Sequence, residues 1–325
     1  MISNESKELI AFYNVENLFS PDPPQVHKLD PTLSGLRNWD ERRYQNKLFK
    51  IAYVFQLIQE TEKTLPFLIG LSEIQGQKPL DDLVAMEPFH SNFGVVHYDS
   101  MDERGVDVAL LYDKNKVEII SSEPITYFFE IEDDNPSNYD TTRDVLFCKV
   151  KYLGEIINVF VLHLPSKREK DVNKPKRDYI IKDLREKVIQ LINQENEAVI
   201  ICGDFNENPI DENLMNLQYD YNSEKKLINP YIDLFEAQKF STFHYKDGLL
   251  FDQIILSEKF FIGDFVLKFS EAKIFNHLKL MNYDKNFAGR PFRTYAGTRY
   301  LGGYSDHFPV ITELKKIIIH KEESN

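Results

Sequence analysis

The stretch Val199-Ile200-Ile201-Cys202-Gly203-Asp204-Phe205-Asn206-Glu207-Asn208-Pro209 joins an apolar run to a glycine, a carboxylate and an amide. A short apolar run that ends at a turn signal predicts a buried strand. The polar residues then follow the carboxyl end of that strand, where α/β sheets bind their ligands. In an extended backbone Asp204 and Asn206 would point the same way and could handle a water and a metal-bound phosphate. Alternatively, they merely form an Asx-turn.

Polar side chains also end two predicted strands in the N-terminal half. Asn14 follows the apolar run Leu9–Tyr13, and Glu73 follows Phe67–Leu71. Burial of a carboxylate costs several kcal/mol unless a cation or hydrogen bonds compensate. Glu73 is therefore the best metal-ligand candidate in this half. The alternative is that Glu73 is an ordinary exposed residue of a loop.

Histidines and aspartates occupy comparable places in the C-terminal half. His163 ends the second strand of a predicted hairpin, Asp252 lies inside an apolar strand, and Asp306 and His307 open the last strand. A histidine titrates near neutral pH and could donate a proton to a leaving oxygen, although a lone histidine is more often structural. The buried Asp252 requires a partner.

Two stretches have helical periodicity, Trp39–Gln59 and Pro175–Gln194. In each, apolar residues recur every three or four positions, which predicts a helix packed on a sheet. The basic residues of the first helix are expected to form a solvated face: Arg42, Arg43, Lys47 and Lys50.

The composition limits the functions that the chain can have. Its 325 residues are 42% hydrophobic and carry a net charge of -13, so the chain can bury a large core but has no overall positive field. This weighs against a tight, sequence-reading duplex binder. Although the chain is acidic overall, the loop-like segment at 275–303, together with Tyr304, carries a local cluster of basic and aromatic residues: Arg290, Arg293, Arg299, Tyr295, Tyr300 and Tyr304.

Cysteine usage and targeting signals give further limits. Cys148 and Cys202 fall in apolar runs and are expected to be buried hydrophobic residues, with no disulfide framework and no zinc spacing. The chain shows no signal peptide and no membrane-spanning stretch. It is expected to be cytoplasmic as written, or extracellular or periplasmic if a signal peptide has been removed.

Taken in order, these residues resemble the motif set of the endonuclease/exonuclease/phosphatase superfamily, which has the deoxyribonuclease-I-like fold. The resemblance covers about residues 9–314, leaving 1–8 as an N-terminal extension and 315–325 as a charged tail that is expected to fray. Three stretches also resemble a bacterial branch with mostly unassigned substrates: Asn14–Phe19, Arg104–Tyr112 and Gly302–His307.

The resemblance implies a single four-layer α/β sandwich, in which two packed mixed β-sheets are flanked by helices. It also implies cleavage of phosphoester bonds with Mg²⁺ or Mn²⁺. Glu73 would hold the metal, with Asn14 and Asp306 close to it. Mg²⁺ takes only one or two carboxylates and keeps several waters, so this small set is sufficient.

The catalytic roles follow from the same resemblance. Asp204 would orient or deprotonate the attacking water, and Asn206 would position that water and the phosphate. His307, held by Asp252, and His163 would stabilise the transition state and assist the leaving oxygen.

Other residues are expected to support this centre. Asp107 or Glu103 is a candidate partner for His163. The substrate-binding candidates are Arg104, Arg293, Arg299 and Tyr304.

Three functions remain open from the sequence. The first is a metal-dependent nuclease, favoured by the branch resemblance and by tyrosines that could stack on bases. The second is a phosphatase or phosphodiesterase for a small or lipid-linked phosphate, favoured by the acidic charge. The third is a non-catalytic phosphate-binding protein of the same fold. No protein partner is implied, and a monomer is expected.

Overall fold

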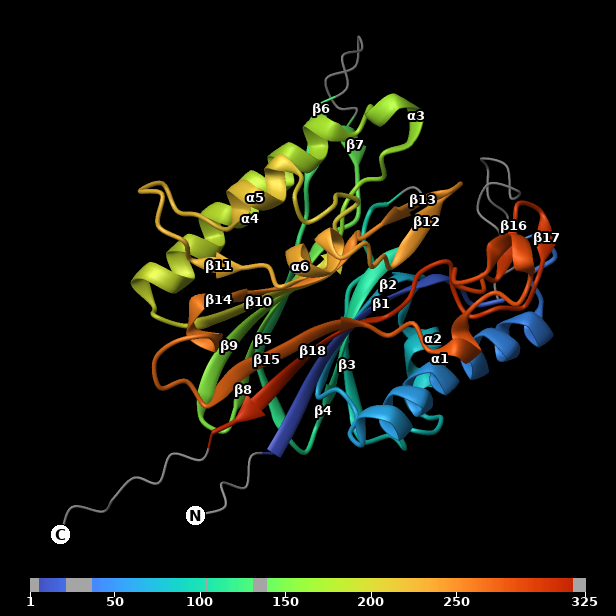
Figure 1. Ribbon diagram of the computed structural model, residues 1–325, viewed down its shortest axis with the longest axis horizontal. Coiled ribbons are helices and arrows are strands. Elements are labelled where there is room, and N and C mark those ends of the chain that lie inside the picture. Colours follow the sequence, from blue (N-terminus) through green and yellow to red (C-terminus); the bar gives the residue numbers. More distant parts are fainter. Residues whose placement is uncertain (1–5, 22–36, 103, 131–138, 318–325) are drawn as a thin grey trace.

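The computed structural model describes residues 6–21, 37–102, 104–130 and 139–317, which fold into four layers. Two six-stranded sheets pack face to face, and helices cover their outer faces (Figure 1). The predicted α/β sandwich is therefore confirmed. Among the described residues, no helix is both long and apolar enough to cross a membrane.

The first sheet contains, in spatial order, β15 (Leu267–Ile274), β18 (Val310–Lys316), β1 (Ser6–Leu18), β2 (Leu68–Ile74), β4 (Asp107–Asp113) and β3 (Phe93–His97). The second contains β11 (Leu227–Ile228), β14 (Asp252–Ser257), β10 (Ala198–Asp204), β9 (Glu155–His163), β8 (Val145–Tyr152) and β5 (Val117–Ile125). Both sheets are mixed, because β1 pairs with β2 and β9 pairs with β10 in parallel while the other pairs are antiparallel.

The helices lie outside the sheets. Figure 1 shows α1 (Glu41–Glu62) and α2 (Gln77–Val84) on the side of the first sheet, and α4 (Lys174–Gln194) and α5 (Glu212–Leu217) on the side of the second. Short elements connect the layers: α3 (Arg168–Asp171), α6 (Tyr231–Glu236), and the 3-10 turns Glu258–Phe260, Leu278–Leu280 and Lys285–Phe287. The described residues also form three two-stranded sheets: β6 (Phe128–Glu130) with β7 (Tyr139–Thr141), β12 (Thr242–His244) with β13 (Asp247–Leu249), and β16 (Tyr295–Ala296) with β17 (Arg299–Tyr300).

The apolar run of β10 is explained by burial on both faces. Ile200 and Cys202 join the core between the two sheets, whereas Val199 and Ile201 join the core beneath α4. Successive strand residues point to opposite faces, so a strand in this position must be apolar throughout. The two sheets approach closely here, since a Cβ at Gly70 would lie 2.7 Å from the Cys202 Sγ.

Helix α1 follows its predicted span, but one of the basic residues predicted on its solvated face is buried. Its amino end is capped by Asp40, whose side chain accepts a hydrogen bond from the Arg43 backbone N–H. The expectation that Lys47 belongs to a solvated face is wrong, because Lys47 is only 1% exposed. Arg42 is exposed as expected. Helical spacing places position 47 between Tyr44 and Ile51, on the buried side.

Several strand boundaries also differ from the prediction. β1 continues past Asn14 to Leu18, because an irregularity in its pairing with β2 lets the strand resume after the polar residues. Asp252 is the first residue of β14 rather than an interior one. The last strand begins at Val310, after Pro309, which has no backbone N–H to give to a ladder.

The ends of the domain extend beyond the predicted limits of 9 and 314. Lys315 and Lys316 pair with β1 in the first sheet instead of fraying, because Lys7 and Ser6 also belong to that strand. The rest of the predicted tail lies outside the described residues.

Candidate active site

Three polar residues form a row across the ends of neighbouring strands in the second sheet. In the strand register Asp204 lies opposite His163 of β9 on one side and opposite Asp252 of β14 on the other. The His163 Nε2 lies 3.6 Å from the Asp204 Oδ2. Backbone pairing alone therefore brings together side chains that are far apart in the sequence.

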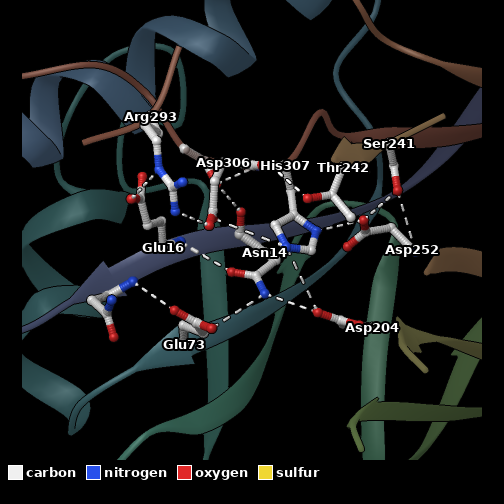
Figure 2. Close-up of polar contacts among 12 residues, drawn as sticks. Asn14, Glu16, Glu73, Asp204, Ser241, Thr242, Asp252, Arg293, Asp306 and His307 are labelled. Atoms are coloured by element: carbon white, nitrogen blue, oxygen red, sulfur yellow. Dashed lines mark hydrogen bonds and ion pairs between the residues drawn. The ribbon is translucent and has the colours of Figure 1, made fainter. Parts of the chain in front are cut away.

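The first sheet contributes Asn14 and Glu73 to the same place (Figure 2). The Asn14 Nδ2 donates to the Asp204 Oδ2 at 3.0 Å and lies 3.5 Å from the Glu73 Oε1. The other Glu73 oxygen accepts a hydrogen bond from the Asn17 backbone N–H. The amide of Asn14 thus links two carboxylates from opposite sheets.

Glu73 reaches this position through a local break in its strand. The pairing of β2 with β4 shifts register between Ser72 and Ile74, and Glu73 has a φ of 65°. A positive φ is costly for a residue other than glycine, and such conformations gather at functional sites. The bulge turns the glutamate side chain toward the centre instead of leaving it on the regular face of the sheet.

The His307 ring is held by Asp252. Its Nδ1 lies 2.6 Å from the Asp252 Oδ2, which also accepts a hydrogen bond from the Ser241 hydroxyl. Burial by itself would lower the pKa of His307, but attraction to Asp252, together with this hydrogen bond, holds the pKa well above its ordinary value. The imidazolium form is therefore favoured near neutral pH.

Asp204 uses its two oxygens differently. Its Oδ1 accepts the Asn206 backbone N–H at 2.9 Å, which is the Asx-turn, while its Oδ2 faces Asn14 and the histidines. The turn and a role in the centre are thus compatible. Burial, followed by repulsion from Asp252, raises the pKa of Asp204 to about 7.

Asn206 departs from the extended geometry that the sequence predicted. Its φ is 50°, so its side chain does not run parallel to that of Asp204. The Asn206 amide donates to the Leu164 carbonyl at 2.8 Å, which fixes the chain just after β9.

Asp306 lies beside this group and belongs to a second, charged network. It accepts a hydrogen bond from Arg293 at 2.8 Å, and its Oδ1 lies 4.0 Å from the His307 Nε2. Burial would raise the pKa of Asp306, but His307 and Arg293 hold it below its ordinary value. Arg293 also lies within electrostatic reach of Glu16 and Glu73.

Glu16 was not singled out by the sequence as a site residue. It is buried, accepts hydrogen bonds from the backbone N–H groups of Thr294 and Tyr295, and lies 3.7 Å from the Arg293 Nε. Burial first, then repulsion from Asp306, raises its pKa to about 7. The only signal was its place inside the stretch Asn14–Phe19.

Lys47 completes the charged network from α1. Its ammonium group donates to the Thr294 hydroxyl at 2.6 Å and to the Tyr304 carbonyl at 2.7 Å. Burial lowers the pKa of Lys47 to about 8, and the attraction of Glu16 opposes that shift. The helix and the loop after Phe292 are therefore joined through a buried charge.

The remaining predicted site residues are more dispersed. Arg104 donates to the Asn17 side chain at 2.9 Å, on the Glu73 side of the centre. Arg299 is exposed. Tyr304 is mostly buried and stacks on Tyr53, so its ring has little free surface for a substrate.

Asp107 and Glu103 were the predicted partners of His163. Asp107 accepts a hydrogen bond from the Ser100 backbone N–H and forms a separate group with His97 and Asp99, whose ligand atoms lie within 4.8 Å of one another. Glu103 lies outside the described residues.

The centre can accommodate a hard cation. Ligand atoms of Asp204, Asp252 and His307 lie within 4.8 Å of one another. The carboxylates of Glu73 and Asp306 are close by and add further oxygen donors. Carboxylate and amide oxygens are the ligands that Mg²⁺ and Mn²⁺ prefer, and a cation would offset the repulsion among these acids.

Comparison with known proteins identifies the family. Residues 9–316 match the model of the endonuclease/exonuclease/phosphatase family, so the chain belongs to that family. Its members are hydrolases that act on phosphoester bonds. A search of curated proteins finds no sequence match.

Solved structures share the fold at low sequence identity. A humanized TDP2 from D. rerio has a TM-score of 0.57 and 16% identity, covering 95% of this chain and 98% of its own. A family protein from Bacteroides thetaiotaomicron has a TM-score of 0.58 and 17% identity over 97% and 100% of the chains. A mannosyl-6-phosphatase of the same species has a TM-score of 0.58 and 17% identity over 94% and 99%.

Proposed function

We propose that this protein is a Mg²⁺- or Mn²⁺-dependent phosphodiesterase that cleaves nucleic acid. The observation that carries the proposal is the surroundings of the Asp204 Oδ2, which lies 3.0 Å from the Asn14 amide, 3.6 Å from His163 and 3.9 Å from His307. A base, a hydrogen-bond donor and two titratable rings thus meet at one point. Phosphoryl transfer to water requires such a set of groups.

Glu73 would hold the metal, with Asn14 and Asp306 beside it. When bound, the cation would neutralise the negative charge that develops on the phosphoryl oxygens. The raised pKa values of Asp204 and Glu16, due first to burial and then to neighbouring carboxylates, are consistent with a centre that is short of positive charge.

Asp204 is the group that orients and deprotonates the attacking water. A general base works best when its pKa lies near the working pH, and the pKa of Asp204 is about 7. The Asx-turn fixes one of its oxygens and leaves the other directed into the centre.

His307 stabilises the charge of the pentavalent transition state and supplies a proton to the leaving oxygen. Asp252 fixes its orientation through the Nδ1, so the Nε2 faces the centre. His163 approaches from the other side of Asp204 and assists the same charge.

Nucleic acid is favoured over other phosphodiesters by the arginines and tyrosines near the centre. In addition, a D. rerio TDP2 structure of the same fold is described as a complex with a single-strand DNA product. The second candidate, a phosphatase for a small phosphate ester, is supported by the mannosyl-6-phosphatase of the same fold and by the net charge of -13. A non-catalytic role is the least favoured, since every expected catalytic residue type is present.

One assay separates these functions. Turnover with Mg²⁺ is measured side by side on plasmid DNA, RNA, bis-nitrophenyl phosphate and a panel of phosphomonoesters. Asp204→Ala serves as the blank, and the exposed Asp264→Ala serves as the matched control. Hydrolysis of nucleic acid that is lost only in Asp204→Ala supports the proposal. Turnover of monoesters alone supports the second function, and no hydrolysis together with no Mg²⁺ binding supports the third.

A further inference from the structure

A cavity of about 510 Å³ opens directly beside the proposed centre. Asp306 and Arg293 lie in its wall and are paired with each other beside the centre, where the Asp306 Oδ1 lies 4.0 Å from the His307 Nε2. The wall also includes Phe243, His244 and Tyr245 from β12 and the turn after it, and Thr242 of β12 forms a β-bridge with His307. A substrate whose phosphate occupies the centre would therefore extend its next chemical group into this cavity.

Five phenylalanine and tyrosine residues line the cavity: Phe243, Tyr245, Tyr283, Phe287 and Phe292. Tyr245 and Tyr283 are each 83% exposed, although a tyrosine ring is usually at least partly covered. Their rings contribute little to the core of the protein. Exposed aromatic surface beside a catalytic centre indicates a binding function.

Arg290 gives the same wall a fixed positive charge. Its guanidinium carbon lies 5.5 Å from the ring centroids of both Phe243 and Phe287, and it donates to the Tyr245 carbonyl. Arg299 adds a second charge, whereas Arg293 is already paired with Asp306. Flat rings with interspersed arginines are typical of sites that stack bases and contact the adjoining phosphates.

We propose that this cavity binds the base of the nucleotide next to the cleaved phosphate in a single-stranded nucleic acid. The inference rests on the proposed function, because it needs the phosphate to lie at the centre. A paired base cannot offer its faces to Tyr283 and Phe287, so the strand must be unpaired there. The volume is sufficient for a ring system of that size.

The test is a binding measurement that needs no turnover. Fluorescence anisotropy with Mg²⁺ and the Asp204→Ala protein compares a labelled oligothymidylate with an oligomer of equal length whose bases are replaced by abasic residues. The two carry the same phosphates, so their ratio isolates the bases. We expect the oligothymidylate to bind about tenfold more tightly. The double variant Tyr283→Ala/Phe287→Ala is expected to bring the ratio to about one.

A matched control uses Tyr221→Ala, because Tyr221 is also exposed but packs on Arg185, away from the cavity. The Tyr221→Ala protein should keep the full ratio of the affinities for oligothymidylate and the abasic oligomer. Three results would overturn the inference. The wild-type cavity could bind the two oligomers equally, the double variant could keep the wild-type ratio of affinities, or a duplex could bind as tightly as the single-stranded oligothymidylate. Hydrolysis of plasmid DNA and RNA by the wild-type protein with Mg²⁺ is measured in parallel. Its absence would overturn the proposed function, whereas the anisotropy ratio reports on the cavity alone.

Discussion

The centre and the cavity beside it lie next to each other but are held in place by different means. At the centre, Asp204 and Asp252 are fixed by strand pairing, and Asn14 joins the two sheets. The cavity is formed largely by the loop-rich segment 282–301, which is attached to the rest of the fold through Glu16 and Lys47. The backbone ladder therefore positions the chemistry, while a buried charge network positions the wall that would contact the substrate.

The largest expected effect lies at the centre. Asp204→Asn preserves the shape of the side chain and the Asx-turn but removes the base. We expect kcat on bis-nitrophenyl phosphate with Mg²⁺ to fall about 10³- to 10⁴-fold. An activity within a few-fold of wild type would show that Asp204 is not the base.

Asp252→Asn tests the pair of Asp252 and His307 at the centre. The change leaves the strand ends in place but removes the charge that favours the His307 imidazolium. We expect kcat to fall about 10²-fold. The double variant with His307→Gln should lose little more than His307→Gln alone, because the two residues act as a unit. Additive losses would contradict this coupling.

Lys47→Met tests how the cavity wall is attached. The change leaves Glu16 and Asp306 buried without one of their cations. We expect the free energy of unfolding in urea at pH 6 to fall by about 3 kcal/mol. The exposed Arg42→Met on the same helix should change it by less than about 0.5 kcal/mol. Equal effects of the two variants would mean that the buried charge does not hold the loop.

The smallest expected effect concerns pH and stability. Because the folded-state pKa of Asp204 is about 7, above its ordinary value, the folded protein holds a proton that the unfolded chain has released. This stabilisation is complete at low pH and is lost as the pH rises through about 7. In EDTA, Asp204→Asn should therefore raise the Tm by a few degrees at pH 8 and by much less at pH 5. A larger rise in Tm at pH 5 than at pH 8 would contradict a raised pKa of Asp204 in the folded protein.

The centre could be predicted from the sequence better than the cavity could. Apolar runs that end near Glu73, His163 and Asp204 located strand ends, whereas β1 continues past Asn14 to Leu18. The ladder pairs Asp204 with His163, and the packing of the two sheets then brings Asn14 to Asp204. Periodicity could have placed Lys47 on the buried side of α1, but its partners lie some 250 positions away and leave no local pattern. The strand boundaries were missed where a bulge or Pro309 interrupts the pairing.

The cavity could be predicted least. Its arginines and tyrosines were visible as a cluster, but Tyr304 packs on Tyr53 while Tyr283, which the sequence did not single out, is exposed in the wall. The exposure of these rings depends on distant contacts, such as that of Tyr304 with Tyr53 of α1. Such contacts between segments far apart in the chain have no signature in composition or spacing.

The most direct test of the central claim is Mn²⁺ binding to the wild-type protein and to Glu73→Gln, measured by electron paramagnetic resonance. Glu73 is expected to hold the metal at the strand ends, so wild-type protein should bind Mn²⁺ at a site that the variant loses or binds at least about tenfold more weakly. Equal binding by the two proteins, or no binding by the wild type, would contradict a metal centre at this place.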